Sequence, residues 1–418
     1  MSRKESSSIK KKSLEGSFQV ILSSKVIFGN PAPDIYTARV PIATASWINT
    51  KEGTVVIDML LSKRNGRDLV KKIEESGGHV KYVVITHAHI DHWGGYNSFE
   101  KKYPEAKIIM QKLGVERIEK YRILAEHRAY MAAVQFDIPE NPRTNDFLEP
   151  TKTYDESMTF KLGGYTFELY HGRGETDDAT WVWVPEIKTV FVGDLLLGMF
   201  PNIGNPFKPT RFGLPWARTL EKIREKKPEM IITGSGVHPV FKKEEVNEVL
   251  DDTIEAIYSI HDQVVNLLNK KVPINEMIHQ VALPEHLNDK SHLRFLYSRP
   301  EFAVYNIYRW YHGYFDFNPA HLLPRPDHEI NNEIFSLIGN KEKILERTKE
   351  LISEDKHQLA LQVLDVLLQY DMENITGREL RIQILKKLQK MDYCLMSRNT
   401  WTYFINQDKR FLSKKEES

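Results

Sequence analysis

Residues 87–92 read His-Ala-His-Ile-Asp-His and follow a run of β-branched residues. A buried imidazole needs a polar partner and a buried carboxylate needs one more strongly, so something must compensate these groups. Nitrogen and oxygen ligands of this kind suit Zn²⁺ and are acceptable to Fe or Mn. The segment therefore predicts a metal site.

The spacing divides the four ligand-type residues into two pairs. A loop after a strand lets side chains converge on one point, so His87 and His89 can face one metal while Asp91 and His92 face another. The alternative is a cluster of core histidines bonded to backbone carbonyls. Four ligand-type side chains in six residues disfavour that alternative.

Strands and helices must alternate around the motif to position it. Short apolar runs at 54–61, 80–86 and 106–111 predict buried strands, and 65–78 predicts an amphipathic helix between the first two. Strand patterns recur at 165–171, 180–185, 188–194 and 229–236, with a helix at 216–227. Such alternation predicts a layered α/β domain.

The strand patterns stop near residue 242, and helical patterns follow at 245–270, 291–315 and 341–406. We therefore expect four parts along the chain. They are a disordered tail at 1–16, a catalytic α/β domain at 17–245, an all-helical domain at 246–408 and a second disordered tail at 409–418.

The motif His-x-His-x-Asp-His before Gly-Gly, following a strand, resembles the signature of metallo-β-lactamase-fold hydrolases. The resemblance implies a four-layer αββα fold over 17–245 and a site for two metal ions, and it says little about the substrate. Asp58, which ends an upstream strand, matches an acidic position that supports the site in that fold. A second segment, 283–324 with Gly-Tyr-Phe-Asp-x-Asn-Pro-Ala inside it, looks like the alkylsulfatase dimerisation domain and implies a homodimer.

The next ligand in most of that superfamily is a histidine in a Gly-His-Thr-like turn, where this chain has Gly-Glu-Thr. Glu175 in that place is similar to the alkylsulfatase branch, in which two carboxylates join the histidines, and Asp194 matches the second one. The alternatives are that Glu175 is an exposed loop acid or that His171 takes its role. Asp177 and Asp178 would orient the histidines or simply form the turn.

The superfamily completes its second metal site with a histidine in a Gly-His-Gly-like turn. This chain has Thr-Gly-Ser-Gly-Val-His after its final strand, so Ser235 falls where one register places that histidine. His238 is the nearest histidine, and we predict it as the last ligand.

Two divalent ions about 3.5–4 Å apart can hold a hydroxide and clamp a substrate oxygen. Zn²⁺ lowers the pKa of bound water to about 7, which supplies a nucleophile at neutral pH. Asp194 would bridge the ions, and Asp91 would orient the attacking water. The expected cofactors are two Zn²⁺ per chain, or Fe or Mn.

The loop after Asp194 carries groups suited to an anionic substrate. Asn202 could donate a hydrogen bond, and Lys208 and Arg211 could neutralise a sulfate. Arg128 is a further candidate contact. The alternative is that Lys208 and Arg211 are solvated loop cations.

Composition narrows the functions further. The chain has 418 residues and a net charge of +1, which provides no general attraction for nucleic acid or an anionic membrane. Its single cysteine, Cys394, rules out an intrachain disulfide and fits a reducing compartment, so we expect a cytoplasmic protein. No apolar stretch reaches about 18 residues, so no membrane span is expected.

These observations predict a two-metal hydrolase of alkyl sulfate esters. One alternative is a lactone, thioester or phosphoester hydrolase of the same fold, which the lack of the sterol-carrier-like domain found in such alkylsulfatases motivates. Another is a non-catalytic partner-binding scaffold, which the displaced His238 motivates.

Overall fold

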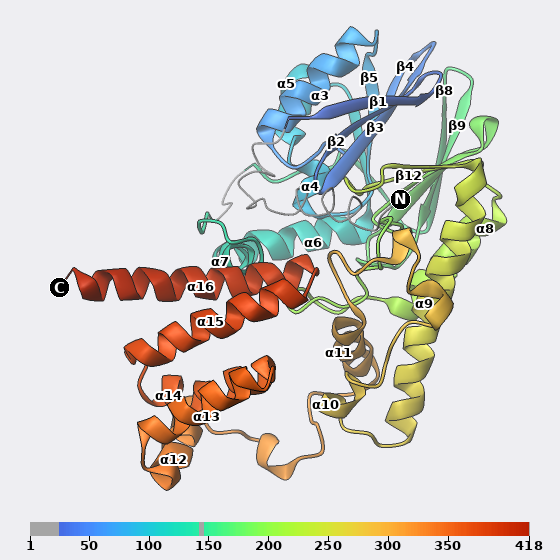
Figure 1. Ribbon diagram of the computed structural model, residues 1–418. Coiled ribbons are helices and arrows are strands. Elements are labelled where there is room, and N and C mark those ends of the chain that lie inside the picture. The colour runs from blue at the N-terminus through green and yellow to red at the C-terminus, as the bar shows by residue number, and fades with distance from the viewer. Residues whose placement is uncertain (1–24, 142–145, 418) are drawn as a thin grey trace, which may run out of the picture. The chain divides into compact units, whose positions relative to one another are not determined.

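The computed structural model describes residues 25–141 and 146–417 (Figure 1). The chain divides into two compact units, Met1–Tyr130 with Glu140–Tyr311 and Met131–Pro139 with His312–Ser418. The first unit therefore continues beyond the domain boundary expected at 245. The tail expected at 1–16 lies outside the described residues.

The first unit contains a seven-stranded sheet in the order β1 to β7. Its first four strands pair antiparallel, and β4 to β7 pair in parallel. The strands are β1 (Ile27–Ala32), β2 (Ile35–Val40), β3 (Ala43–Thr50), β4 (Gly53–Ile57), β5 (Val80–Ile85), β6 (Lys107–Gln111) and β7 (Lys152–Tyr154).

A second, six-stranded sheet has the order β13-β12-β11-β10-β9-β8. Within it β11 and β12 are parallel, so their carboxyl ends lie at the same edge. The strands are β8 (Ser157–Leu162), β9 (Tyr165–His171), β10 (Thr180–Val184), β11 (Thr189–Gly193), β12 (Met230–Thr233) and β13 (Val240–Lys242).

Alternation along the strands builds the layers. In β5, Val83 and Ile85 belong to a buried cluster shared with the helix beside the sheet, whereas Val84 belongs to a cluster made by both sheets. Figure 1 shows α3 (Lys63–Glu75) and α5 (Tyr96–Lys102) beside the first sheet and α8 (Gly213–Glu225) beside the second. The predicted four-layer αββα fold is confirmed.

The remaining helices of the first unit surround this framework. Residues 112–136 form two helices that meet at Leu124. These helices are α4 (Ile90–Trp93), α6 (Lys112–Ile123), α7 (Ala125–Phe136, which continues into the second unit), α9 (Lys243–Asn269), α10 (Ile274–Met277) and α11 (Pro300–Tyr311).

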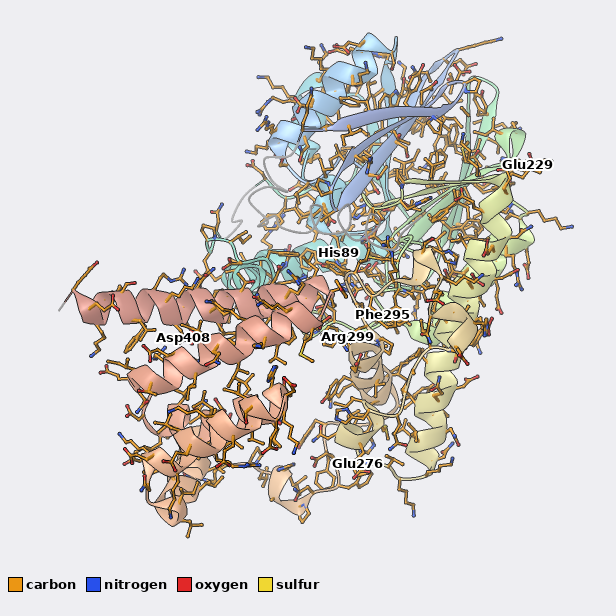
Figure 2. The ribbon with its side chains drawn as sticks, in the orientation of Figure 1. His89, Glu229, Glu276, Phe295, Arg299 and Asp408 are labelled. Atoms are coloured by element: carbon orange, nitrogen blue, oxygen red, sulfur yellow. The ribbon has the colours of Figure 1, made fainter. Side chains whose placement is uncertain are left out.

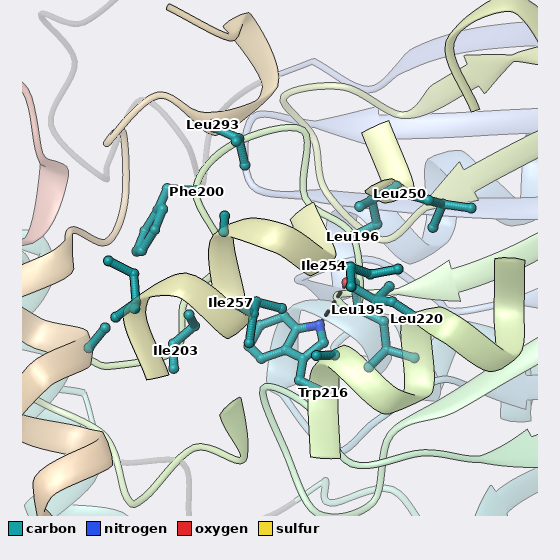
Figure 3. Close-up of a cluster of buried hydrophobic side chains, with 14 of the residues drawn as sticks. Leu195, Leu196, Phe200, Ile203, Trp216, Leu220, Leu250, Ile254, Ile257 and Leu293 are labelled. Atoms are coloured by element: carbon teal, nitrogen blue, oxygen red, sulfur yellow. Dashed lines mark hydrogen bonds between the residues drawn. The ribbon is translucent and has the colours of Figure 1, made fainter. Parts of the chain in front are cut away.

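Figure 3 shows Trp216, on α8, within a cluster of buried apolar side chains. Its ring is fully buried among Leu195, Leu220 and Ile257, and its Nε1 donates a hydrogen bond to the Leu195 carbonyl at 2.8 Å. A Cβ added to Gly174 would lie 3.2 Å from the same ring. One tryptophan thus supports the residues that precede Glu175 and follow Asp194.

The second unit is helical, as predicted for the C-terminal part of the chain. Its own cluster is formed by apolar residues of four successive helices. The helices of this unit are α12 (Asp327–Ile338) and the four that form the cluster, α13 (Lys341–Ser353), α14 (His357–Tyr370), α15 (Ile375–Met391) and α16 (Leu395–Glu416).

The end of α16 corrects one expectation. Residues 409–416 are helical rather than a disordered tail. Asp408, labelled in Figure 2, is fully buried and accepts hydrogen bonds from Arg378 and Arg381 at 2.6 and 2.7 Å. Arg378 also stacks over Phe411 at 4.0 Å, so the polar terminal sequence is held by contacts with α15 that its composition does not reveal.

None of the helices in the two described stretches of the chain combines the length and apolar content that a bilayer span requires.

Candidate active site

The ligand-type residues follow strand ends from both sheets. Asp58 follows β4, His87 follows β5 by one residue, and Asp194 follows β11 directly. Two backbone hydrogen bonds join the sheets at this edge, from Thr180 N–H to Thr86 O at 2.7 Å and from Thr44 N–H to Gly234 O at 2.6 Å. The two sheets therefore bring the side chains together.

Six of the seven predicted metal ligands meet at this edge. His87, His92 and Asp194 form one group of converging ligand atoms, and His89, Glu175 and Asp194 form another (His89 is labelled in Figure 2). Asp91 borders the first group, with its Oδ2 3.6 Å from His92 Nε2. Asp194 belongs to both groups.

The distances match the edges of a coordination polyhedron. Ligand atoms about 2.1 Å from a tetrahedral Zn²⁺ lie about 3.4 Å from one another. Asp194 Oδ2 lies 3.5 Å from His92 Nε2 and 3.7 Å from His87 Nε2, and His89 Nδ1 lies 4.0 Å from Glu175 Oε1. These separations are too long for hydrogen bonds and suit a shared ion.

Asp58 fixes the orientation of His92. The buried carboxylate accepts hydrogen bonds from the Thr86 N–H and hydroxyl, each at 2.8 Å, and lies 2.8 Å from His92 Nδ1. This contact places the Nδ1 proton toward Asp58, so Nε2 presents its lone pair to the cluster. Asp58 thus supports the site without belonging to either ligand group.

Two buried polar atoms at the centre have no hydrogen-bond partner. They are His92 Nε2 and Asp194 Oδ1. A buried nitrogen and a buried carboxylate oxygen without partners are costly unless a cation satisfies both. The residues present therefore fit a metal ion.

The pKa values of the histidines divide them into two kinds. Burial lowers the pKa of His87 and His89 well below the usual range, so both rings are neutral and can donate lone pairs. Burial also acts to lower the pKa of His92, but the carboxylates of Asp194, Asp58 and Asp91 raise it well above the usual value. Negative charge is thus concentrated around His92, as a cation site requires.

Glu175 is held by a second set of contacts. Its Oε1 accepts a hydrogen bond from Asn202 Nδ2 at 2.7 Å and lies 2.9 Å from the Arg211 guanidinium, which also donates to the Glu175 carbonyl. Arg211 is itself fixed at its backbone, where its N–H bonds to Asn306 Oδ1 at 2.7 Å. Asn202 and Arg211, predicted to bind substrate, are therefore engaged with a predicted metal ligand. Burial raises the pKa of Glu175 to about 7, although the positive charge of Arg211 acts to lower it.

Arg117 on α6 is a residue that the sequence reasoning missed. It contacts Asp177 and lies 3.2 Å from Asp178 Oδ1. Asp178 Oδ2 accepts the Ala88 N–H at 2.8 Å, between His87 and His89. Arg117 and Asp178 thus connect the turn after Glu175 to the histidine loop. A contact with the histidine loop was predicted for Asp178 but not for Arg117.

Three further groups lie within electrostatic reach of the carboxylates. Burial lowers the pKa of Lys208 to about 8 and lowers that of Arg128, while Asp91 opposes both shifts. Arg128 stacks over the Tyr121 ring at 3.4 Å. Burial, with the charges of Glu175 and Asp91, raises the pKa of Tyr297 well above the usual range. Tyr297 lies in the segment 283–324, which resembles the alkylsulfatase dimerisation domain.

The structure does not bring His238 into either group. Its ring stacks on Phe241 at 4.1 Å, and a Cβ on Gly198 would lie 2.5 Å from its own Cβ. The ring therefore packs against these residues and not against His92. His171 is also separate, because its Nε2 bonds to the Asp177 carbonyl at 2.6 Å.

Asp58→Asn is expected to weaken metal binding about 10–100-fold, because an amide cannot hold the His92 tautomer as a carboxylate does. Competition with a chromophoric chelator measures the affinity. Asp34→Asn, on an exposed turn, is the matched control and should leave it unchanged. Equal affinities of Asp58→Asn and wild type would show that Asp58 does not orient a ligand.

Residues 38–235 match the model of the metallo-beta-lactamase superfamily. With two sheets and flanking helices, the chain has the fold of that superfamily. Residues 273–408 match the alkyl sulfatase dimerisation model. The two matched regions confirm the resemblances seen in the motifs.

Individual relatives agree with this assignment. The chain is 25% identical to a linear primary-alkylsulfatase from a Pseudomonas strain, covering 86% of this chain and 72% of the relative. It is 24% identical to an (R)-specific secondary-alkylsulfatase from Pseudomonas sp., over 85% of this chain and 58% of the relative. The solved structure of the stereoselective inverting sec-alkylsulfatase Pisa1 from Pseudomonas sp. has a TM-score of 0.81 at 21% identity, covering 90% of this chain and 64% of that one. The chain thus spans less than two thirds of the last two proteins.

Proposed function

We propose that the protein is a metal-dependent hydrolase of alkyl sulfate esters. The observation that carries the proposal is the pair of ligand groups that share Asp194. The alkylsulfatase relatives support a sulfate ester as the substrate class.

In this proposal His87, His89, Asp91, His92, Glu175 and Asp194 hold two divalent cations, with Zn²⁺ suited to the nitrogen and oxygen donors. When bound, the cations would lower the pKa of water and neutralise charge on the ester. Asp194, which belongs to both ligand groups, would contribute its carboxylate to both cations. Asp91, whose side chain is 21% exposed, would orient the attacking water.

Positive side chains give the anionic ester its orientation. Lys208 and Arg128 supply charge beside Asp91, and the Tyr297 hydroxyl stays protonated because its pKa is raised. Arg211 and Asn202 act through Glu175, since their polar atoms already contact it. We assign substrate binding first to Lys208.

The function is tested by sulfate release from a medium-chain alkyl sulfate. Removal of metal with a chelator and the His89→Ala substitution are each expected to abolish turnover, and added Zn²⁺ should restore only the wild type. His286→Ala, at a residue that pairs with Glu255 on the surface, is the control. Turnover that persists after both treatments would refute the function, and a panel of lactones, thioesters and phosphoesters separates the alternative substrates.

A pH dependence of substrate binding follows from Lys208. Its pKa is lowered to about 8, so the ammonium is charged below that pH and loses its charge above it. The KM for an alkyl sulfate is therefore expected to rise as the pH passes through about 8, because the ester stays anionic throughout. Lys208→Arg keeps its charge, so its KM should stay flat over the same range. Parallel KM profiles for the two proteins would contradict the role of Lys208.

We also propose a homodimer. The match to the dimerisation model supports it, and so do large apolar side chains on the second unit, where Leu323 and Leu337 are 83% and 87% exposed. Sedimentation at micromolar concentration tests the assembly, and a monomer would count against it.

A further inference from the structure

Ser298 joins the segment before α11 to the loop that follows Asp194. The residue is fully buried, and its Oγ donates a hydrogen bond to the Gly204 carbonyl at 2.7 Å. The two residues are 94 positions apart in the chain, so this bond connects two distant segments. Removal of the hydroxyl would take the donor away from a buried carbonyl, which costs more than the loss of an exposed hydrogen bond.

Gly204 allows the two segments to approach closely, because it has no side chain. A Cβ at this position would lie 1.9 Å from the carbonyl oxygen of Phe302 and 2.6 Å from the nitrogen of Ala303. The backbone of the loop therefore lies directly against the first turn of α11. Ile203, labelled in Figure 3, belongs to the same buried apolar cluster as Ala303 and Ile307.

Two groups that we assign to the anionic substrate adjoin this contact. Tyr297 directly precedes Ser298, and Lys208 follows Gly204 by four residues. The intervening turn is closed by the Lys208 N–H, which donates to the Asn205 carbonyl at 3.3 Å. A single side-chain hydrogen bond thus holds together the two segments that carry these groups.

We infer that Ser298 is a positioning residue for the substrate. Its bond to the loop sets how Lys208 and Tyr297 lie relative to each other, and so sets the affinity for an anionic head group. This inference rests on the proposed function, in which Lys208 binds the ester. The predicted metal ligands are held by other contacts, so the bond can be removed without removing the partner of a ligand.

The position of Ser298 in the chain gives the inference a wider meaning. The residue lies within the region 273–408 that matches the alkyl sulfatase dimerisation model. It nevertheless belongs to the first unit, together with the loop that it contacts. The beginning of the matched region would therefore serve substrate binding.

Ser298→Ala is expected to raise KM for a medium-chain alkyl sulfate about tenfold and to leave kcat within about twofold of the wild type. The affinity for an alkylsulfonate of the same chain length, which has no ester bond to cleave, should fall by the same factor in calorimetry. Hydrogen exchange measured by mass spectrometry should become faster over residues 200–211 and stay unchanged over α9. The metal content should also stay unchanged.

Thr253→Val is the matched control, because it also removes a buried hydroxyl that donates to a backbone carbonyl. Thr253 is 3% exposed, and its Oγ1 bonds to the Val249 carbonyl at 2.6 Å within α9. This variant should keep the KM, the sulfonate affinity and the exchange rates over 200–211 of the wild type.

A Ser298→Ala protein with unchanged KM and sulfonate affinity would overturn the inference, even if exchange over 200–211 became faster. A fall in kcat at constant KM would overturn it as well. If the wild type cleaves alkyl sulfates and the variant matches it in every measurement, the inference fails and the proposed function stands. If the wild type binds the sulfonate but cleaves no sulfate ester, and the variant binds it more weakly, the inference stands and the proposed hydrolysis fails. If the wild type neither binds the sulfonate nor cleaves a sulfate ester, both fail.

Discussion

Asp194→Asn is expected to lower kcat/KM for an alkyl sulfate by about 10³-fold or more, because one carboxylate serves both ligand groups. Its Oδ2 lies 3.5 Å from His92 Nε2 and 3.7 Å from His87 Nε2, so its charge would offset that of the proposed cations. Asparagine keeps the shape of the side chain and removes that charge. Steady-state kinetics at saturating Zn²⁺ measure the loss.

The control for this substitution makes the same chemical change nearby. Glu168→Gln alters a carboxylate on β9 that pairs with Lys226 at 3.0 Å and belongs to neither ligand group. It should leave kcat/KM within about twofold of the wild type. An Asp194→Asn protein as active as this control would show that no shared carboxylate is needed.

Trp216→Ala is expected to lower the free energy of unfolding of the first unit by about 3–5 kcal/mol, since it empties a fully buried indole site. The substitution also removes the hydrogen bond to the Leu195 carbonyl and the ring that packs on Gly174. These neighbours adjoin Asp194 and Glu175, so metal affinity should fall with stability. Urea unfolding followed by circular dichroism measures the first effect, and chelator competition measures the second.

Two further variants calibrate the tryptophan result. Trp216→Phe keeps most of the apolar volume and should cost less than Trp216→Ala. Tyr305→Ala, at an exposed residue of α11, should change stability by no more than about 0.5 kcal/mol. A Trp216→Ala protein as stable as Tyr305→Ala would mean that the cluster repacks without the indole.

The local part of the site could be predicted from the sequence. His87, His89, Asp91 and His92 share one loop after one strand, so their convergence depends only on β5 ending before them. Asp194 could be predicted for a similar reason, because it directly follows an apolar strand. Glu175 needed the family resemblance, since an acid in a turn is otherwise unremarkable.

The supporting contacts could not be predicted, because they join distant segments. Arg117 lies 60 positions from Asp177, and Asn306 lies 95 positions from Arg211. Nothing in the composition of α6 or α11 distinguishes these residues from surface polar groups. His238 was predicted as a ligand because it is close in sequence to the position where the superfamily has a histidine. Its ring instead stacks on Phe241.

Asn306 connects α11, which lies outside the region matched by the superfamily model, to the loop that contains Arg211. The superfamily match ends at residue 235, but Asn306 grips both the N–H and the carbonyl of Arg211, which in turn holds Glu175. A shortened chain that stops near residue 245 would keep every predicted ligand. It would lose Asn306 and therefore the contacts that hold Arg211 beside Glu175. We therefore expect the smallest active fragment to extend through α11.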